Sequence, residues 1–178
     1  MQEHERERQQ WDHEREAHRP YWDQPVRVSP SCSAYGTMEY KARLWNVPPG
    51  SDWYQACIGM VQQIHGRTLE KPDRTCSFGP TRDGIWGYWR VGFDEPQCMT
   101  SWGGPWDKGC VRSGGVQLVE ASLRGQKSED DEFRMCWTTT GHLASMAADL
   151  GFPNDCQQRG WAGGGMVSMW EIRDEKCN

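Results

Sequence analysis

The stretch Asp52-Trp-Tyr-Gln-Ala-Cys57 decides how this sequence is interpreted, because a related stretch, Asp131-Glu-Phe-Arg-Met-Cys136, follows 79 positions later. In both stretches an aspartate precedes a cysteine by five positions. The other cysteines keep this interval: the chain has eight, in two sets of four, and matching the sets gives offsets of 78, 79, 80 and 79. A fixed interval of this kind is the signature of a repeated structural unit. The sequence therefore predicts two copies of one unit.

The composition favours disulfide bonds and an oxidising environment. The chain has 178 residues, including 20 glycines and 10 prolines, so few aliphatic residues remain for a core, and we expect eight cysteines and eleven tryptophans to supply much of the stability. An even number of regularly spaced cysteines without any Cys-x-x-Cys pair favours disulfides over a zinc site. Because disulfides persist outside the cytosol, we expect a secreted, extracellular protein.

Several classes of function are disfavoured. No stretch approaches the roughly 18 apolar residues of a membrane span, and a net charge of −5 without a basic block disfavours nucleic acid as a partner. Nucleophile-elbow, metalloprotease and phosphate-loop motifs do not occur, so we expect a non-enzymatic protein without catalytic residues, metal site or cofactor. One alternative stays open: His65 and His142 follow the two predicted helices at similar positions and could be a two-histidine acid/base site.

The first copy has the pattern of a β-α-β-β unit. Residues 36–45 alternate as a strand with one buried face, and residues 53–65 form an amphipathic pattern after an N-cap at Ser51 or Asp52. We expect this helix to bury Tyr54, Cys57, Ile58 and Val61 and to end at Gly66. Two strands, near 75–79 and 85–93, follow around a turn at 80–84.

The second copy repeats this order. It has a predicted strand at 115–123, a helix beginning in the acidic stretch 129–137 and a second short helical piece within 141–150. Residues 99–109 are too irregular for a helix or a strand and are interpreted as a linker. Trp89 and Trp170 occupy matching strand positions, and we expect both in the core.

Residues 1–30 are interpreted as a charged N-terminal arm. Its first part favours a solvated helix without an apolar stripe. It is either a mobile or loosely attached arm, or a pro-segment or partner-binding arm with Trp11, Tyr21 and Trp22 as anchors. The expected fold class is α+β: a disulfide-rich two-layer α/β sandwich with mainly antiparallel sheet, and a monomer. The expected domains are the arm at 1–30, a first repeat at 31–98, a linker at 99–109 and a second repeat at 110–178, with residues 31–178 forming one compact body.

The disulfide pairing follows from the repeat. Eight cysteines allow 105 pairings, but two equal copies are expected to close their own two bonds in the same way. In a right-handed β-α-β-β unit the third strand returns, so its end lies near the start of the first strand. The expected strand-end pairs are Cys32 with Cys98 and Cys110 with Cys177, and the expected helix-to-strand pairs are Cys57 with Cys76 and Cys136 with Cys156.

Trp102, Trp106 and Trp161 lie in glycine-rich segments and are the candidate partner-binding residues. Large flat rings form recognition surfaces for protein or glycan, although the same rings could instead cover a seam between the two copies. Tryptophans arranged along an open groove would favour glycan, whereas a flat or convex patch would favour protein.

The blocks Asp52-Trp-Tyr-Gln-Ala-Cys57, Thr75-Cys-Ser-Phe78 and Gly87-Tyr-Trp-Arg-Val91, with a closing Cys98, resemble small secreted cysteine-rich effectors of filamentous fungi. The resemblance is greatest to the necrosis-inducing factor family and to killer-toxin-like proteins, and it spans residues 32–177. It implies a secreted α/β protein that acts on a host or competitor cell, with a host protein as partner and no catalytic residues to carry over. The alternative is a secreted carbohydrate-binding or hydrolytic protein that acts on glycan or RNA.

Overall fold

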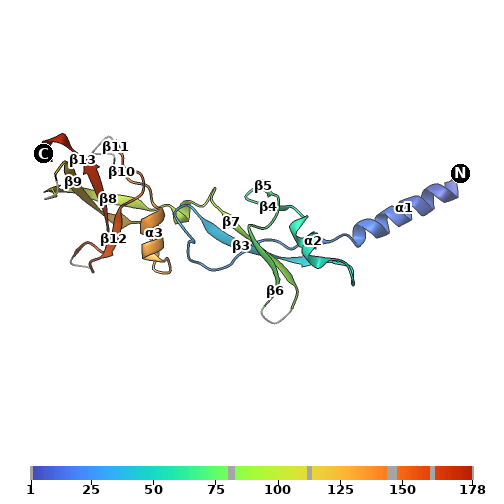
Figure 1. Cartoon of the computed structure of the whole chain (residues 1–178). Helices are drawn as coiled ribbons and strands as arrows, with labels where there is room; N and C mark the ends of the chain where they lie inside the picture. Colours follow the sequence, from blue (N-terminus) through green and yellow to red (C-terminus); the bar gives the residue numbers. More distant parts are fainter. Residues whose placement is uncertain (1, 80–82, 112–113, 144–147, 161–162, 178) are drawn as a thin grey trace. The chain divides into compact units, whose positions relative to one another are not determined.

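A computed structural model describes residues 2–79, 83–111, 114–143, 148–160 and 163–177 (Figure 1). Residue contacts divide the chain into two compact units, Met1–Val28 with Glu39–Val91 and Ser29–Met38 with Gly92–Asn178. The described residues form a mixed α/β structure with mostly antiparallel sheets, three α-helices and four disulfide bonds, which confirms the expected mixed class. That residues 31–178 form one body stays a prediction.

The N-terminal arm is shorter than predicted. Helix α1 (Gln2–Ala17) is polar on all sides, and its Trp11 is 67% exposed. Strands β1 (Tyr21–Trp22) and β2 (Val26–Arg27) follow, and both pair antiparallel with β3 (Met38–Trp45). Two short segments of the predicted arm, Tyr21–Trp22 and Val26–Arg27, therefore belong to a sheet.

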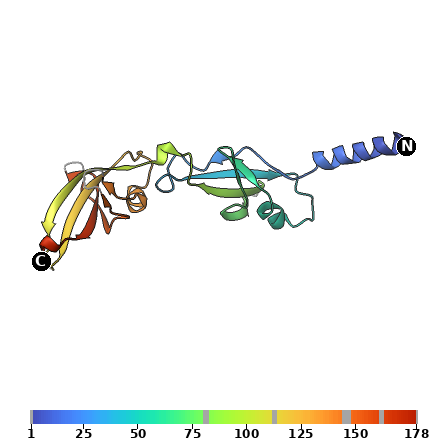
Figure 2. The ribbon, with the colours of Figure 1, turned by 90° about the horizontal axis from the view of Figure 1, so that it is seen from above.

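The sheet of the first unit has the order β1-β3-β7-β6, with β2 also on β3. Strands β6 (Arg74–Phe78) and β7 (Ile85–Val91) form its other half, and helix α2 (Trp53–Ile58) lies against them (Figure 2). The three predicted strands are confirmed. Residues alternate along β3 between buried and partly exposed, and buried Leu44 belongs to the same core cluster as Cys57 of α2. Residues 80–82 of the predicted turn lie outside the described residues.

The helix predicted over 53–65 is wrong beyond Ile58. Its start is confirmed, because the Asp52 carboxylate accepts hydrogen bonds from the Tyr54 and Gln55 amides, both at 3.1 Å. The helix has six residues and ends at the C-cap Gly59, so Val61 does not reach the core and is 55% exposed.

A hairpin takes the place of the rest of that helix. Strands β4 (Gln62–Ile64) and β5 (Arg67–Leu69) pair around His65 and Gly66, whose φ angles are 51° and 73°. Two successive residues with positive φ are the geometry of a tight hairpin turn. Gly66 therefore reverses a strand and does not end a helix.

The second unit has the sheet order β8-β9-β13-β12, with α3 against β12 and β13 (Figure 2). Its elements are β8 (Ser101–Cys110), β9 (Val116–Arg124), α3 (Glu132–Thr138), β12 (Asp155–Gln158) and β13 (Met166–Arg173). The strand and the helix predicted before residue 138 are confirmed, and Asp131 is the N-cap of that helix. The helical piece predicted within 141–150 is wrong: its described residues form the antiparallel pair β10 (His142–Leu143) and β11 (Ala148–Asp149). Residues 144–147 lie outside the described part.

The predicted linker at 99–109 is also wrong, since most of it is the edge strand β8. This strand pairs with β9 through two register shifts, between Gly103 and Trp106 and between Asp107 and Cys110. Bulges at a sheet edge accommodate glycines and a proline that a regular central strand would exclude. The irregular sequence therefore reflects an irregular strand.

Each sheet buries one tryptophan and covers it with another. Trp89 and Trp170 are 1% and 2% exposed, as the sequence predicted. Trp22 on β1 packs edge-on against Trp89, and Trp102 on β8 packs in the same way against Trp170; the ring centres are 5.0 Å apart in both pairs. Each covering indole N–H donates to a backbone carbonyl in the loop after the helix. These rings fill cores that have few aliphatic side chains.

The structure contains the four disulfides that the sequence analysis expects, with Cα–Cα distances of 5.6, 6.1, 5.3 and 6.3 Å. Two of them, Cys57–Cys76 and Cys136–Cys156, join a helix to an edge strand. The other two bonds each end in a short 3₁₀ turn. Cys32, in the loop before β3, is bonded to Cys98 of η1 (Pro96–Cys98), and Cys110, at the end of β8, is bonded to Cys177 of η3 (Glu175–Cys177).

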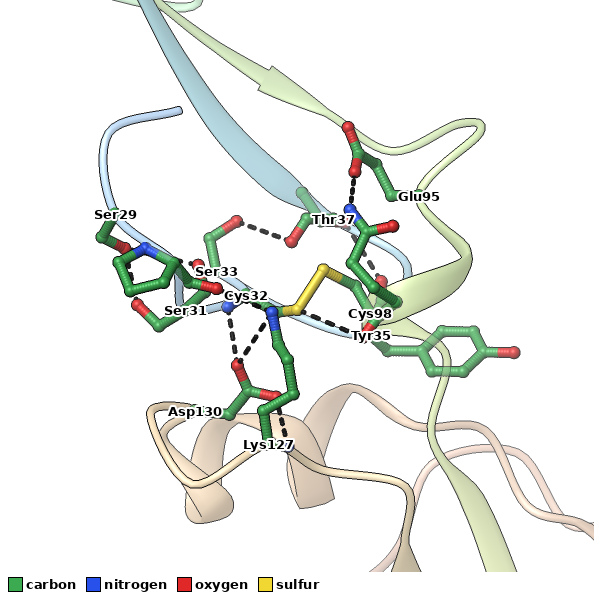
Figure 3. The surroundings of a disulfide bond; sticks show 12 residues. Ser29, Ser31, Cys32, Ser33, Tyr35, Thr37, Glu95, Cys98, Lys127 and Asp130 are labelled. Carbon is green, nitrogen blue, oxygen red and sulfur yellow. Dashed lines mark hydrogen bonds and ion pairs between the residues drawn. A yellow bond between two sulfur atoms is a disulfide. The ribbon is translucent and has the colours of Figure 1, made fainter. Parts of the chain in front are cut away.

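The Cys32–Cys98 bond lies in the second unit, beside a buried aspartate (Figure 3). Asp130 has a fully buried side chain and accepts hydrogen bonds from the Cys32 amide at 2.7 Å and the Lys127 amide at 2.9 Å. The Lys127 ammonium also donates to the Pro30 carbonyl at 2.6 Å. Residues 29–38, which cysteine spacing assigns to the first copy, are therefore held within the second unit.

Replacing Trp22 with alanine should destabilise the first unit by about 2–4 kcal/mol, because the change opens a cavity over Trp89. Trp11→Ala removes an equally large side chain from the exposed helix α1 and should change stability by less than about 0.5 kcal/mol. Denaturant titration of both variants provides the measurement. Equal stabilities would show that Trp22 is not part of the core.

Asp130→Ala should destabilise the second unit by about 2–3 kcal/mol, because the buried Cys32 amide and the partly buried Lys127 amide lose their acceptor. The exposed neighbour Glu129 provides the matched control, Glu129→Ala. Hydrogen exchange followed by mass spectrometry should show faster exchange over residues 29–38 in the Asp130 variant only. Unchanged exchange there would contradict the anchoring role of Asp130.

Candidate functional site

The bulge in β8 separates two of the predicted binding tryptophans. Trp102 lies opposite Leu123 and Trp106 lies opposite Glu120, so four steps along β8 correspond to only three steps along β9. Without the extra residue, positions 102 and 106 would lie on the same face of the sheet, because side chains alternate with a period of two. Trp102 instead covers the core, and Trp106 lies on the face directed away from α3.

Trp106 is 45% exposed and borders a pocket of about 430 Å³, which we call the Trp106 site. The pocket lies on the face of the second sheet that α3 leaves open. Residues from three strands and one glycine-rich loop form its walls: Trp106, Lys108, Glu120, Arg159, Gly163, Gly164 and Val167.

A buried carboxylate organises the charges of this site. Glu120 is only 5% exposed, and both of its oxygens accept hydrogen bonds from the Arg159 guanidinium, at 2.7 and 2.8 Å. The Lys108 ammonium lies 3.6 Å from the same carboxylate. A paired, hydrogen-bonded arrangement of this kind compensates much of the cost of burying a charge. Arg159 is thereby held in one orientation beside Trp106.

The cations of Arg159 and Lys108 lower the pKa of the Glu120 carboxyl. The hydrogen bonds from Arg159 are the main cause, burial opposes them, and the charges of Arg159 and Lys108 add to them. The same bonds raise the pKa of the Arg159 guanidinium. The site therefore contains one carboxylate and two cations at neutral pH, with a net charge of +1.

The remaining predicted site residues do not join the Trp106 site. Trp161 lies outside the described residues. His65 lies in the hairpin turn of the first unit, where its Nε2 is 3.1 Å from the Tyr40 hydroxyl, and His142 begins β10 in the second unit. Each histidine thus follows the helix of its own unit. The eight cysteines all form disulfides.

A larger hollow of about 750 Å³ lies beside the Cys32–Cys98 bond in the second unit. Its walls are mainly apolar, with Tyr35, Phe93, Pro96 and Met99, and the carboxylate of Glu95 there is bonded to the Gln97 side chain. This hollow contains none of the residues predicted to bind a partner. The Trp106 site combines an exposed ring with oriented charges, which is the stronger basis for recognition.

Sequence reasoning missed Lys108, Glu120 and Arg159. Glu120 did carry a signal, because it is the single acid within the otherwise apolar and neutral strand 116–123. Arg159 carried none, since 39 positions separate it from Glu120 and only the strand order brings the two together.

Comparisons with protein-family models, with curated proteins and with solved structures found no match to this chain. No helix among the described residues is long and apolar enough to cross a membrane.

Glu120→Gln should alter the pH dependence of stability. Because the pKa of Glu120 is lower in the folded state, its stabilising effect is fully present above the unfolded value of about 4.3 and is lost as pH falls through the folded value. The stability difference between wild type and Glu120→Gln should therefore be constant from pH 7 to 5 and shrink below pH 4. Urea titrations across this range measure it, with exposed Glu171→Gln as the matched control. A difference that stays constant down to pH 2 would contradict the role of the ion pair.

Proposed function

We propose that this chain is a secreted, non-enzymatic effector or toxin-like protein that binds a host protein through the Trp106 site. The four disulfides support a protein that works in an oxidising environment. The fungal origin follows from the resemblance of the cysteine blocks and is part of the proposal.

The exposed ring of Trp106 beside a fixed Arg159 is the observation that carries this function. Tryptophan and arginine are enriched among residues that dominate binding energy in protein interfaces. Arg159 is bound to Glu120 through two hydrogen bonds, so little side-chain freedom is lost when a partner contacts it. A prearranged ring and guanidinium suit a protein partner.

The separation of the tryptophans favours protein over glycan. A sugar chain is bound best by several rings along one groove, but Trp102 is turned into the core and its indole N–H donates to the Thr140 carbonyl at 3.0 Å. Trp106 alone presents its ring at the described part of the site. One aromatic anchor with charged neighbours is the arrangement of an interface hot spot.

We further propose that the two units are copies of one β-α-β-β design, each a two-layer arrangement of helix on sheet. Their sheets have equivalent strand orders, β1-β3-β7-β6 and β8-β9-β13-β12. In each unit a disulfide joins the helix to an edge strand. The covering tryptophans Trp22 and Trp102 extend the repeat beyond the cysteines.

Affinity capture with the full disulfide-bonded chain tests the function. Wild type and Phe152→Ala, a control that removes a 63% exposed ring elsewhere in the second unit, should retain the same protein from host extracellular fluid. Trp106→Ala should lose it, and the purified partner should bind about 30-fold more weakly, the effect of a 2 kcal/mol hot spot. If no variant retains a protein while the wild type binds chitin or glucan or cleaves RNA, the proposal is wrong.

A further inference from the structure

The first sheet has an open face with two cations held against tryptophan rings. Lys41 and Arg43 alternate with buried residues along β3, so both lie on the face directed away from α2. The Arg43 guanidinium lies 3.9 Å from the centre of the Trp45 ring, and the Lys41 ammonium lies 5.3 Å from the centre of the Trp86 ring. We call Lys41, Arg43, Trp45 and Trp86 the cation–tryptophan face.

These two cations have no acidic partner among the residues that the structure describes. The Nε of Arg43 is buried and lacks a hydrogen-bond acceptor there. Gly84 allows this close packing, because a Cβ at that position would lie 2.5 Å from the Arg43 Nε. Neither cation therefore forms a direct ion pair with a described carboxylate, and both keep donors for an incoming acceptor.

The acids that reach this face bind other groups, and Glu39, on the same face of β3, accepts a hydrogen bond from Arg90 at 3.3 Å. Asp23 accepts the indole N–H of Trp45, and Asp83 accepts that of Trp86, each at 3.4 Å. Both carboxylates therefore hold the edges of the rings on which the cations lie. These bonds orient the rings that Lys41 and Arg43 contact.

The spacing of the cations indicates the shape of a partner. Side chains two residues apart on a strand are separated by about 6.8 Å, twice the rise per residue. The side chains of an extended peptide have the same separation at alternate positions. Two carboxylates in the pattern acid-x-acid can therefore meet Lys41 and Arg43 together.

We propose that the cation–tryptophan face binds an acidic, extended peptide segment of a partner protein, with aspartate or glutamate at alternate positions. Each carboxylate forms charge-assisted hydrogen bonds to one cation, and such bonds are stronger than those between neutral groups. This surface belongs to the first unit and is independent of the Trp106 site. The protein thus has a second binding surface with its own chemistry.

Peptide is favoured over nucleic acid or glycan by the positions of the cations. Bases and sugars bind such surfaces by stacking on open ring faces, but Trp45 and Trp86 each present a ring face to a cation. The chain also has a net charge of −5, which opposes the long-range attraction that nucleic-acid binding needs. A short acidic segment can bind through the local charges of Lys41 and Arg43 alone.

Fluorescence anisotropy with the full disulfide-bonded chain tests this proposal. The probe is a labelled peptide with glutamate at alternate positions separated by glycine, and the control peptide has the same composition with its glutamates adjacent at one end. The wild type should bind the alternating peptide more tightly, and the affinity should fall as salt is raised. Lys41→Gln should weaken binding about tenfold, and adding Arg43→Gln should weaken it further.

Two controls make the result specific. Lys71→Gln removes an exposed lysine elsewhere in the first unit and should leave binding unchanged, as should Trp106→Ala, which affects only the proposed function. Circular dichroism verifies that each variant is folded, and Lys41→Gln serves alone if the double variant is not. Equal affinity for both peptides, no binding, no effect of Lys41→Gln, or preferential binding of oligothymidine or polygalacturonate would each overturn the proposal.

Discussion

The bond between helix and strand, Cys57–Cys76 in one unit and Cys136–Cys156 in the other, is the constraint on which each sheet depends. Helices α2 and α3 have only six and seven residues, and helices of that length are not stable alone in water. The disulfide holds each helix over one face of its sheet, and the half-cystines of both helices are fully buried. One covered face is then enough for a core, which leaves the opposite face free for charged and aromatic side chains.

Local signals in the sequence predicted the parts of the fold that local physics determines. The N-caps Asp52 and Asp131 marked where the helices begin, because their carboxylates accept the first free amides. Alternation marked the strands, and equal cysteine spacing indicated equal pairing. Trp22 shows a signal that was present but not used: it lies 80 residues before Trp102, yet its charged neighbourhood assigned it to the arm. Matching aromatic positions as well as cysteines would have made Trp22 the counterpart of Trp102 and a member of the first copy.

The features that the sequence did not indicate depend on strand pairing and on contacts between residues far apart in the chain. The side of the sheet on which Trp106 lies depends on one extra residue in β8, and a bulge of this kind has no distinct pattern among the glycines around Pro105. Asp130 binds a backbone amide 98 positions away, and Arg159 reaches Glu120 only because β13 lies between β12 and β9. The contact between Glu120 and Arg159 could therefore be recognised only once the strand order was known.

The two sheets have similar cores, but their open faces have different charges. Lys41 on β3 and Glu120 on β9 lie 79 positions apart, each in the strand next to the edge of its sheet, and they have opposite charges. Glu120 is neutralised within the protein by Arg159 and Lys108, whereas Lys41 has no acidic partner among the described residues. A core tolerates little change because its packing is shared by many side chains, but an open face can change its charge without affecting the fold. The same scaffold can therefore present two unlike surfaces, and the binding chemistry of one unit cannot be inferred from that of the other.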